Sequence, residues 1–250
     1  MLIFLMNINV EIKLNVENKL KNIQKMLRII DQKNKKWYNL NWEVMTLNIY
    51  SAKLTGANFL YNETKILGNY LLNGEDPKEL RKRNIEENLI KYKSPKAISR
   101  VNSPIFERLN VFNEEMLDEF VNGDLENSRL LLVYAIMKTD NLVCDFITDI
   151  YKDRILRYKD YIEQFEINDW FENIYVNSNL CNVSDTTKYK LKQVMMRIMI
   201  DSGLVKKEDD KYKILIPILS SRFEYLLTSV GDVDYYKAIG GIIWKQSIID

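Results

Sequence analysis

Histidine is absent from this 250-residue chain. A Ser-His-Asp triad, a Cys-His pair, a histidine-ligated metal and an imidazole acid–base step are therefore excluded. Only two cysteines occur, Cys144 and Cys181, and they form no CxxC pair. Neither a disulfide framework nor a thiolate zinc site is indicated, so a reducing, cytoplasmic setting is expected. With no phosphate loop and no metal-ligand spacing either, the sequence predicts neither a cofactor nor an enzyme.

Glycine and proline are scarce, at 8 and 4 residues. Together they make up about 5% of the chain, where average usage is about 12%. This scarcity disfavours glycine-rich nucleotide-binding α/β folds and short-strand sandwiches or barrels, which spend many residues on turns. The leading fold class is therefore all-α, in one large domain or two small ones.

Long hydrophobic runs are also missing. The longest, Leu130–Met137, is far shorter than the roughly 18 residues that a membrane-spanning helix needs. We expect it to form the buried side of a central helix. The apolar start, Met1–Met6, has no basic region before it, so a secretory signal is not expected. The sequence predicts a soluble protein without a membrane partner, and a monomer.

Charge is balanced overall, at 36 basic against 35 acidic residues, but it is segregated along the chain. Residues 78–108 carry nine bases and four acids, and residues 188–213 carry eight bases and four acids. The stretch 109–187 between them has sixteen acids and six bases. A single run of this kind is usually a solvated helix face. Two such runs on similar motifs favour a binding function.

The first basic segment predicts two helices joined by a tight turn. One helix is expected over about 77–91, with Asp76 as N-cap, Pro77 at the first position and an apolar stripe of Ile85, Leu89 and Tyr92. Ser94 and Pro95 start the second helix. One of its faces carries Ile98, Val101, Ile105 and Leu109, and the other carries Lys96, Ser99, Arg100 and Ser103. This pattern is typical of a DNA-recognition helix. Because Pro104 disfavours helical geometry at Ser103, a kink or a restart capped by Ser103 is expected there.

The second basic segment predicts a helix from the cap cluster at 184–187 to about Ser202, ended by Gly203. Lys190, Gln193 and Arg197 share its outer face, opposite an inner stripe of Leu191, Met195, Ile198, Met199 and Ser202. A basic hairpin over about 204–215, with Lys206 and Lys207, follows. Together they suggest a winged helix-turn-helix. A helix packed on a purely structural hairpin remains the equal alternative, and Met195, Met196 and Met199 are expected to fill the core.

The order of motifs resembles the BrxA family of BREX bacteriophage-exclusion systems. In the N-terminal half, the resemblance rests on residues 50–57 (YSAKLTGA), Glu63, 88–90 (NLI), Ser94-Pro95, Arg100 and 107–109 (ERL). In the C-terminal half, it rests on 130–134 (LLLVY), Asp145-Phe146, 187–204 and 217–220 (PILS). It covers about residues 48–228. It implies a compact all-α protein with two helix-turn-helix elements, basic surface near them, DNA binding and no catalytic centre.

We therefore expect a non-enzymatic protein that binds double-stranded DNA with little sequence preference, alongside other BREX proteins. The expected contacts are Lys96, Ser99, Arg100, Lys190, Gln193, Arg197, Lys206 and Lys207. An adaptor that docks on other defence proteins without touching DNA is the alternative. The expected regions are an N-terminal extension (1–44), a region with the first helix-turn-helix (45–112), a region with the second (113–230) and a C-terminal tail (231–250). The extension carries Leu20, Ile23, Leu27 and Ile30 at helical spacing.

Overall fold

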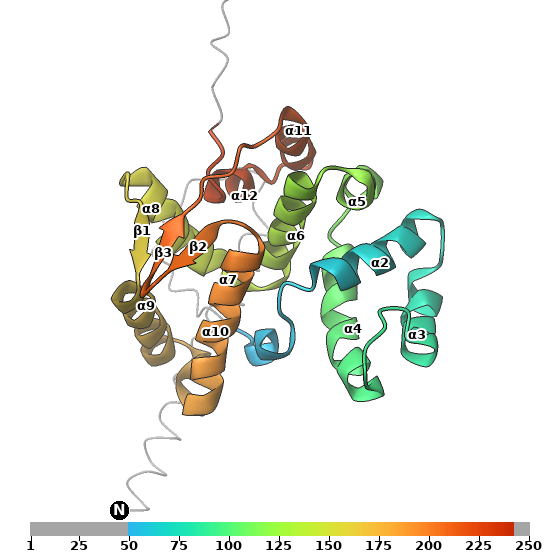
Figure 1. The fold of residues 1–250 in the computed structure, drawn as a ribbon, viewed down its shortest axis with the longest axis horizontal. Helices are drawn as coiled ribbons and strands as arrows, with labels where there is room; N and C mark the ends of the chain where they lie inside the picture. The colour runs from blue at the N-terminus through green and yellow to red at the C-terminus, as the bar shows by residue number, and fades with distance from the viewer. Residues whose placement is uncertain (1–49, 243–250) are drawn as a thin grey trace, which may run out of the picture. The chain divides into compact units, whose positions relative to one another are not determined.

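The computed structural model of the protein describes residues 50–242. The chain divides into two units, 1–46 and 47–250, and only the second contains described residues. The predicted extension and its Leu20–Ile30 stripe therefore lie outside the described part. The expectation of a mainly helical fold with a C-terminal hairpin is confirmed (Figure 1).

The first half of the described chain is helical and runs into a central helix, α6. Its elements are η1 (Ala52–Gly56), α2 (Tyr61–Leu72), α3 (Pro77–Glu87), α4 (Pro95–Leu109), α5 (Glu114–Asn122) and α6 (Leu125–Thr139). Every residue from Leu130 to Met137 is buried, which confirms the predicted central position of this run. α6 contacts α4 and α5 on one side and α7 and α12 on the other. The apolar run is thus covered all round.

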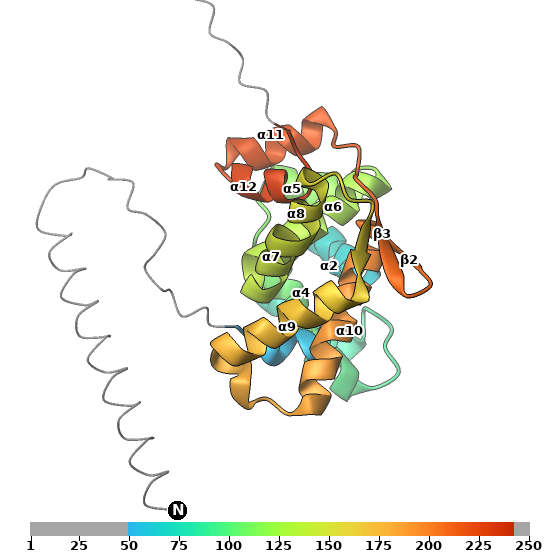
Figure 2. The same cartoon turned by 90° about the vertical axis from the view of Figure 1, so that its left-hand side faces the viewer.

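The second half adds a small sheet to the helices. Its elements are α7 (Asn141–Phe146), the π-helical η2 (Ile147–Lys152), α8 (Asp153–Leu156), β1 (Tyr161–Glu163), α9 (Gln164–Asn177), η3 (Asn179–Asn182), α10 (Asp185–Asp201), β2 (Val205–Glu208), β3 (Lys211–Ile214), α11 (Ser221–Ser229) and α12 (Val233–Ala238). The strand order is β1-β3-β2, all antiparallel, with Ile162 opposite Tyr212 and Val205 opposite Ile214. Figures 1 and 2 both show α9 beside α10.

Helix starts follow the local capping residues closely. The side chain of Asp76 accepts hydrogen bonds from the backbone N–H groups of Lys78 and Glu79. Ser94 and Ser184 cap α4 and α10 in the same way. Because such caps satisfy N–H groups that a helix leaves unpaired, these starts are set by sequence alone.

The predicted end of the first basic helix is wrong, and of its predicted apolar stripe only Leu89 and Tyr92 pack against the core, from beyond the end of the helix. α3 ends at Glu87, because Asn88 adopts a left-handed conformation with φ 56°. The buried positions of α3 are Leu80 and Asn84, and Asn84 donates to the buried Asn102 of α4 at 3.0 Å. Ile85 lies off this face and is 41% exposed.

The expected restart at Pro104 does not occur. α4 continues as one helix through Pro104, and the Ser103 hydroxyl donates to Glu107 at 2.8 Å instead of capping a new helix. The apolar face of α4 is buried as predicted, because Ile98, Val101, Ile105 and Leu109 all pack into the core.

The region expected as a C-terminal tail begins with α12, which packs against α11 and η2. Tyr236 and Ile239 are buried there. Tyr134 of α6 and Lys138 both donate to Asp232, immediately before α12, at 2.6 Å and 2.9 Å. These bonds join residues 232–239 to the central helix. Residues 243–250 lie outside the described part.

Candidate nucleic-acid interface

Helix α10 presents the predicted polar face. Leu191, Met195, Ile198, Met199 and Ser202 are buried as expected, and Gly203 ends the helix with φ +85°, a backbone conformation that favours glycine. On the opposite side, Lys190, Gln193 and Arg197 are exposed.

The hairpin that follows α10 places its two lysines on opposite faces. Lys207 pairs in register with Tyr212, whereas Lys206 pairs with Lys213. Successive strand residues point to opposite sides of a sheet, so only one of the two faces α10. The Lys207 side lies toward α10, and Lys206 lies 3.5 Å from Glu208 instead.

α10 and the hairpin enclose a groove of about 690 Å³ together with α9, η1 and the residues that follow η1. We call it the α10–hairpin groove. Its lining residues are Thr55, Asn58, Gln164, Ile167, Asn168, Tyr189, Lys190, Lys192, Gln193, Val194, Met196, Arg197, Ile200, Lys207 and Tyr212. Four of them are cations and none is a carboxylate.

The cations of the groove differ in how far they are neutralised. Arg197 donates to Asp201 at 2.8 Å, one turn along α10. Lys192 donates to Asn168 at 3.2 Å and lies 3.8 Å from Glu172. Within residues 50–242, neither Lys190 nor Lys207 has a carboxylate within 4 Å. These two ammonium groups are therefore the most available to an anionic ligand.

A second hollow, of about 640 Å³, opens beside the groove. It is lined by residues 58–63, Tyr92, Arg129, Arg197, Ile200 and Asp201. Arg197 lines both hollows. The second hollow therefore joins α10 to the turn between α3 and α4.

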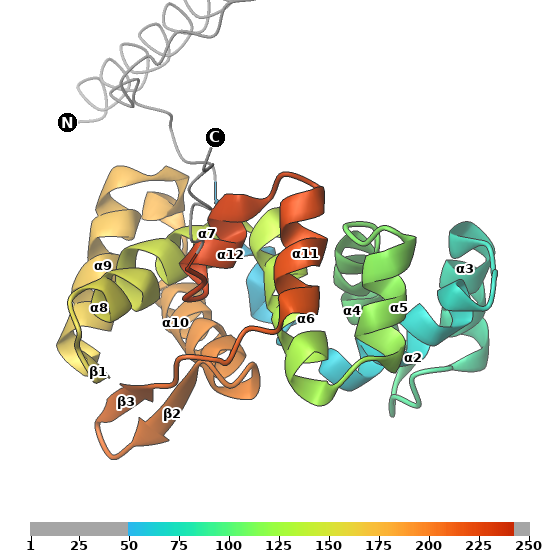
Figure 3. The same cartoon turned by 90° about the horizontal axis from the view of Figure 1, so that it is seen from above.

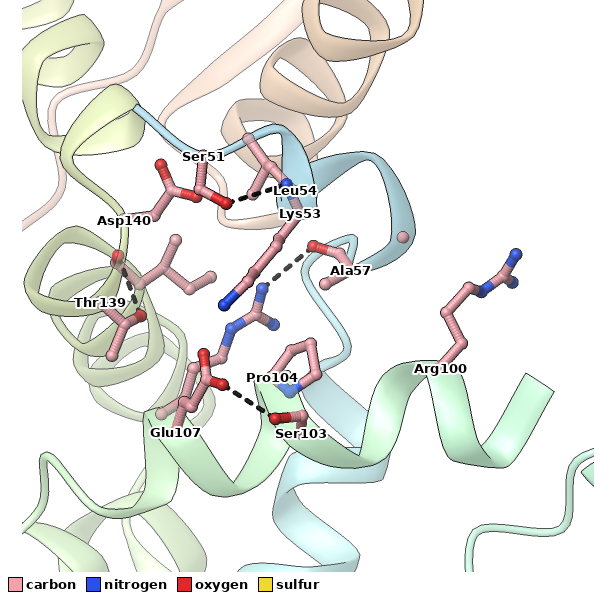
Figure 4. Close-up of a pocket in the computed structure, with 13 residues that line it drawn as sticks. Ser51, Lys53, Leu54, Ala57, Arg100, Ser103, Pro104, Glu107, Thr139 and Asp140 are labelled. Atoms are coloured by element: carbon pink, nitrogen blue, oxygen red, sulfur yellow. Dashed lines mark hydrogen bonds between the residues drawn. The ribbon is translucent and has the colours of Figure 1, made fainter. Parts of the chain in front are cut away.

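The three predicted residues of α4 lie apart from the α10–hairpin groove. Lys96, Ser99 and Arg100 are exposed, and the Ser99 hydroxyl donates to the backbone of Pro95 at 3.1 Å. The side chain of Arg100 lines a smaller pocket of about 360 Å³ between η1, α4 and the end of α6. In Figure 4 the head group of Arg100 points away from that pocket, whereas Lys53 reaches into it.

Arg108 is the buried cation of this smaller pocket. Its guanidinium donates to the backbone carbonyls of Ala57, Asn58 and Phe59 at 2.9–3.0 Å. Burial lowers the pKa of Arg108 to about 10, although the carboxylates of Asp140, Glu107 and Glu63 oppose this shift. The Arg108 side chain thereby holds residues 57–59 in place, and Asn58 of this segment lines both larger hollows.

The structure brings together half of the predicted contact residues. Lys190, Gln193, Arg197 and Lys207 line one groove, while Lys206, Lys96, Ser99 and Arg100 lie outside it. Sequence reasoning missed Tyr189, Lys192, Tyr212, Thr55 and Asn58 as groove residues. Tyr189 and Lys192 lie next to Lys190 and Gln193 along α10, whereas Thr55 and Asn58 arrive by a long-range contact that no local pattern signals.

Comparison with known proteins identifies the family. A model of the BrxA family matches residues 48–231. The chain belongs to the BrxA family. A protein of Bacillus cereus (strain H3081.97) named BREX protein BrxA is 26% identical over 194 residues, which cover 77% of this chain and 97% of that protein. A protein of the same name from Escherichia coli O9:H4 (strain HS) is 23% identical over 158 residues, which cover 61% of this chain and 72% of that protein.

The fold has a counterpart among solved structures. The crystal structure of an uncharacterized protein from Magnetospirillum magneticum superposes with a TM-score of 0.66 at 19% identity, covering 76% of this chain and 97% of that one. At this identity the likeness shows the fold alone. Of the helices in the described part, none is long and apolar enough to cross a membrane.

Proposed function

We propose that this BrxA-family chain is a non-enzymatic component of a BREX bacteriophage-exclusion system and that it binds double-stranded DNA. Family membership and the names of the relatives support the assignment to a BREX system. The DNA-binding part rests on the α10–hairpin groove.

The order of elements around the groove supports DNA binding. A helical segment (141–156), β1, α9, α10 and the β2–β3 hairpin follow one another as in a winged helix-turn-helix, with α10 in the place of the recognition helix and the hairpin as the wing. In proteins of this kind the recognition helix enters the major groove and neighbouring groups contact the phosphates.

The observation that carries the proposal is the composition of the groove, which has four cations and no carboxylate among its lining residues. Lysine side chains suit phosphate contacts, which position a protein without specifying bases. Gln193 is the one groove residue of α10 with an amide suited to pairing with a base edge. The protein should therefore bind DNA with little sequence preference. These groups suit anion binding, so we propose no reaction at this site.

The test is a titration of a labelled duplex with the full chain at two salt concentrations. If the four groove cations all contact phosphates, the logarithm of the affinity should fall with the logarithm of salt with a slope of about −3.6. The double substitution Lys190→Glu with Lys207→Glu should bring that slope to about −1.8 and weaken binding. Lys159→Glu with Lys237→Glu makes the same change of charge at exposed lysines outside the groove and is the matched control.

One further observation favours the adaptor as a second candidate function. Large apolar side chains are exposed near the end of α8 and after β3: Leu156 (66%), Tyr158 (95%), Ile216 (58%) and Ile218 (85%). Exposed apolar patches commonly mark protein-interaction surfaces. If the chain does not shift DNA at low salt but binds another BREX protein through this surface, the adaptor function would replace DNA binding as the proposed function.

A further inference from the structure

The turn between α3 and α4 is a built structure and presents lysines to solvent. Asn88 clamps it, because its side chain accepts from the N–H of Tyr92 and donates to the carbonyl of Tyr92, both at 2.7 Å. The Tyr92 hydroxyl then donates to Glu63 of α2 at 2.8 Å. These bonds hold the turn in place on α2.

Three exposed lysines surround this clamp, namely Lys91, Lys93 and Lys96. Lys91 adopts a left-handed backbone with φ 56°, a strained conformation for a lysine, which the clamp maintains. Within residues 50–242, no carboxylate lies within 4 Å of any of the three ammonium groups. The turn is thus a fixed, un-neutralised cluster of positive charge.

The clamped turn and α10 share the second hollow. Tyr92 from the turn and Arg197 from α10 both line it, and Arg197 also lines the α10–hairpin groove. In Figure 3 the β2–β3 hairpin and the turn both lie at the lower edge of the view, on the same side of the described unit. The two carboxylates of this hollow are already engaged, Glu63 by Tyr92 and Asp201 by Arg197.

We infer that the α3–α4 turn and the α10–hairpin groove form one continuous site that engages a single DNA duplex, with Lys91 and Lys93 on the phosphate backbone beyond the groove. This inference rests on the proposed function. A duplex presents a phosphate charge about every 1.7 Å along its axis, so a duplex that lies in the groove and extends across the second hollow brings phosphates to the turn. The two elements then act as one site, and each raises the effective concentration of DNA at the other.

The experiment compares a turn variant with a matched control on duplexes of increasing length. The turn variant is Lys91→Gly with Lys93→Glu, in which glycine suits the positive φ at position 91. The control is Lys159→Ala with Lys237→Glu, which changes the charge by the same amount at exposed sites away from the turn. Affinity is measured by fluorescence anisotropy at two salt concentrations, on duplexes from about 8 to about 30 base pairs.

On the longest duplex, the turn variant should bind at least about tenfold more weakly than the parent, with a salt slope reduced by about 1.8, while the control binds like the parent. On the shortest duplex, which offers fewer phosphates to the two elements, the loss of affinity in the variant should be smaller than on the longest one. The inference is overturned if the turn variant binds long duplexes like the parent. It is also overturned if the turn lysines bind a second duplex. In that case the parent would bridge two differently labelled duplexes, and the turn variant would not. Failure of the parent to bind any duplex at low salt would instead refute the proposed function itself.

Discussion

Replacing Arg108 by methionine removes a buried cation and three hydrogen bonds at once, so the sign and size of the effect depend on two opposing contributions. In the parent protein, the guanidinium of Arg108 donates hydrogen bonds to the carbonyls of Ala57, Asn58 and Phe59. Hydrogen bonds with a charged partner contribute about 1.5–3 kcal/mol each, which gives roughly 4–9 kcal/mol for three. Burial opposes this, because the pKa of Arg108 falls from 12.5 to about 10, equivalent to roughly 3 kcal/mol.

The difference leaves a net stabilisation of roughly 1–6 kcal/mol, and we take the middle of this range, about 3 kcal/mol, as the expected loss. For a domain of about 150–250 residues, that loss lowers the Tm by roughly 6–12 °C. The assay is thermal unfolding followed by circular dichroism. Arg100→Met, on the same helix but exposed, is the control and should change stability by less than about 0.5 kcal/mol. An Arg108→Met protein that melts with the control would refute the reasoning, because the buried charge would then cost as much as its bonds contribute.

Two further predictions concern the helices and the tyrosines. Pro104→Ala restores an N–H group that can donate to the carbonyl of residue 100, a gain in stability of up to about 3 kcal/mol. This gain should exceed the loss of about 1 kcal/mol that comes from a less restricted unfolded chain, so the Tm should rise. A Tm lower than that of the parent would show that the packing of the Pro104 ring contributes more than the restored hydrogen bond. Alkali should unfold the protein, because burial raises the pKa of several tyrosine hydroxyls in the folded state. The pKa of Tyr92 rises to about 12, and the pKa values of Tyr134, Tyr151 and Tyr175 are raised as well. The folded state then keeps tyrosine protons that the unfolded state loses near pH 10. The stabilisation from these tyrosines is therefore complete below pH 10 and is lost as the pH rises above it. The lowered pKa of Arg108 has the opposite effect on stability over this range, but Arg108 is a single group. Denaturant midpoints measured from pH 8 to 11.5 that stay constant while tyrosinate absorbance rises would contradict this.

Local chemistry made much of the helical framework predictable. The caps Asp76, Ser94 and Ser184, and the stop at Gly203, act through their own and the next few residues, so they are visible in any sequence. The buried faces of α4 and α10 follow from helical spacing alone. By contrast, β1 has three residues, too few to show alternation, and it exists because β3 offers it a partner. The end of α3 depended on the clamp between Asn88 and Tyr92, which acts against the apolar spacing of Ile85 and Leu89.

The candidate site was only half predictable because part of its wall, Thr55 and Asn58, belongs to residues 50–59, which bond to both halves of the described chain. Tyr50 bonds to Asn179 and Asp145 of the second half, and the carbonyls of 57–59 bond to Arg108 of the first. The residues between these anchors line all three hollows. Periodicity identified the polar face of α10, but the groove exists only where this anchored segment runs beside that face. Both anchors join residues 49 to 129 positions apart in the chain, so the geometry of the interface is set by tertiary bonds that a local sequence pattern does not encode.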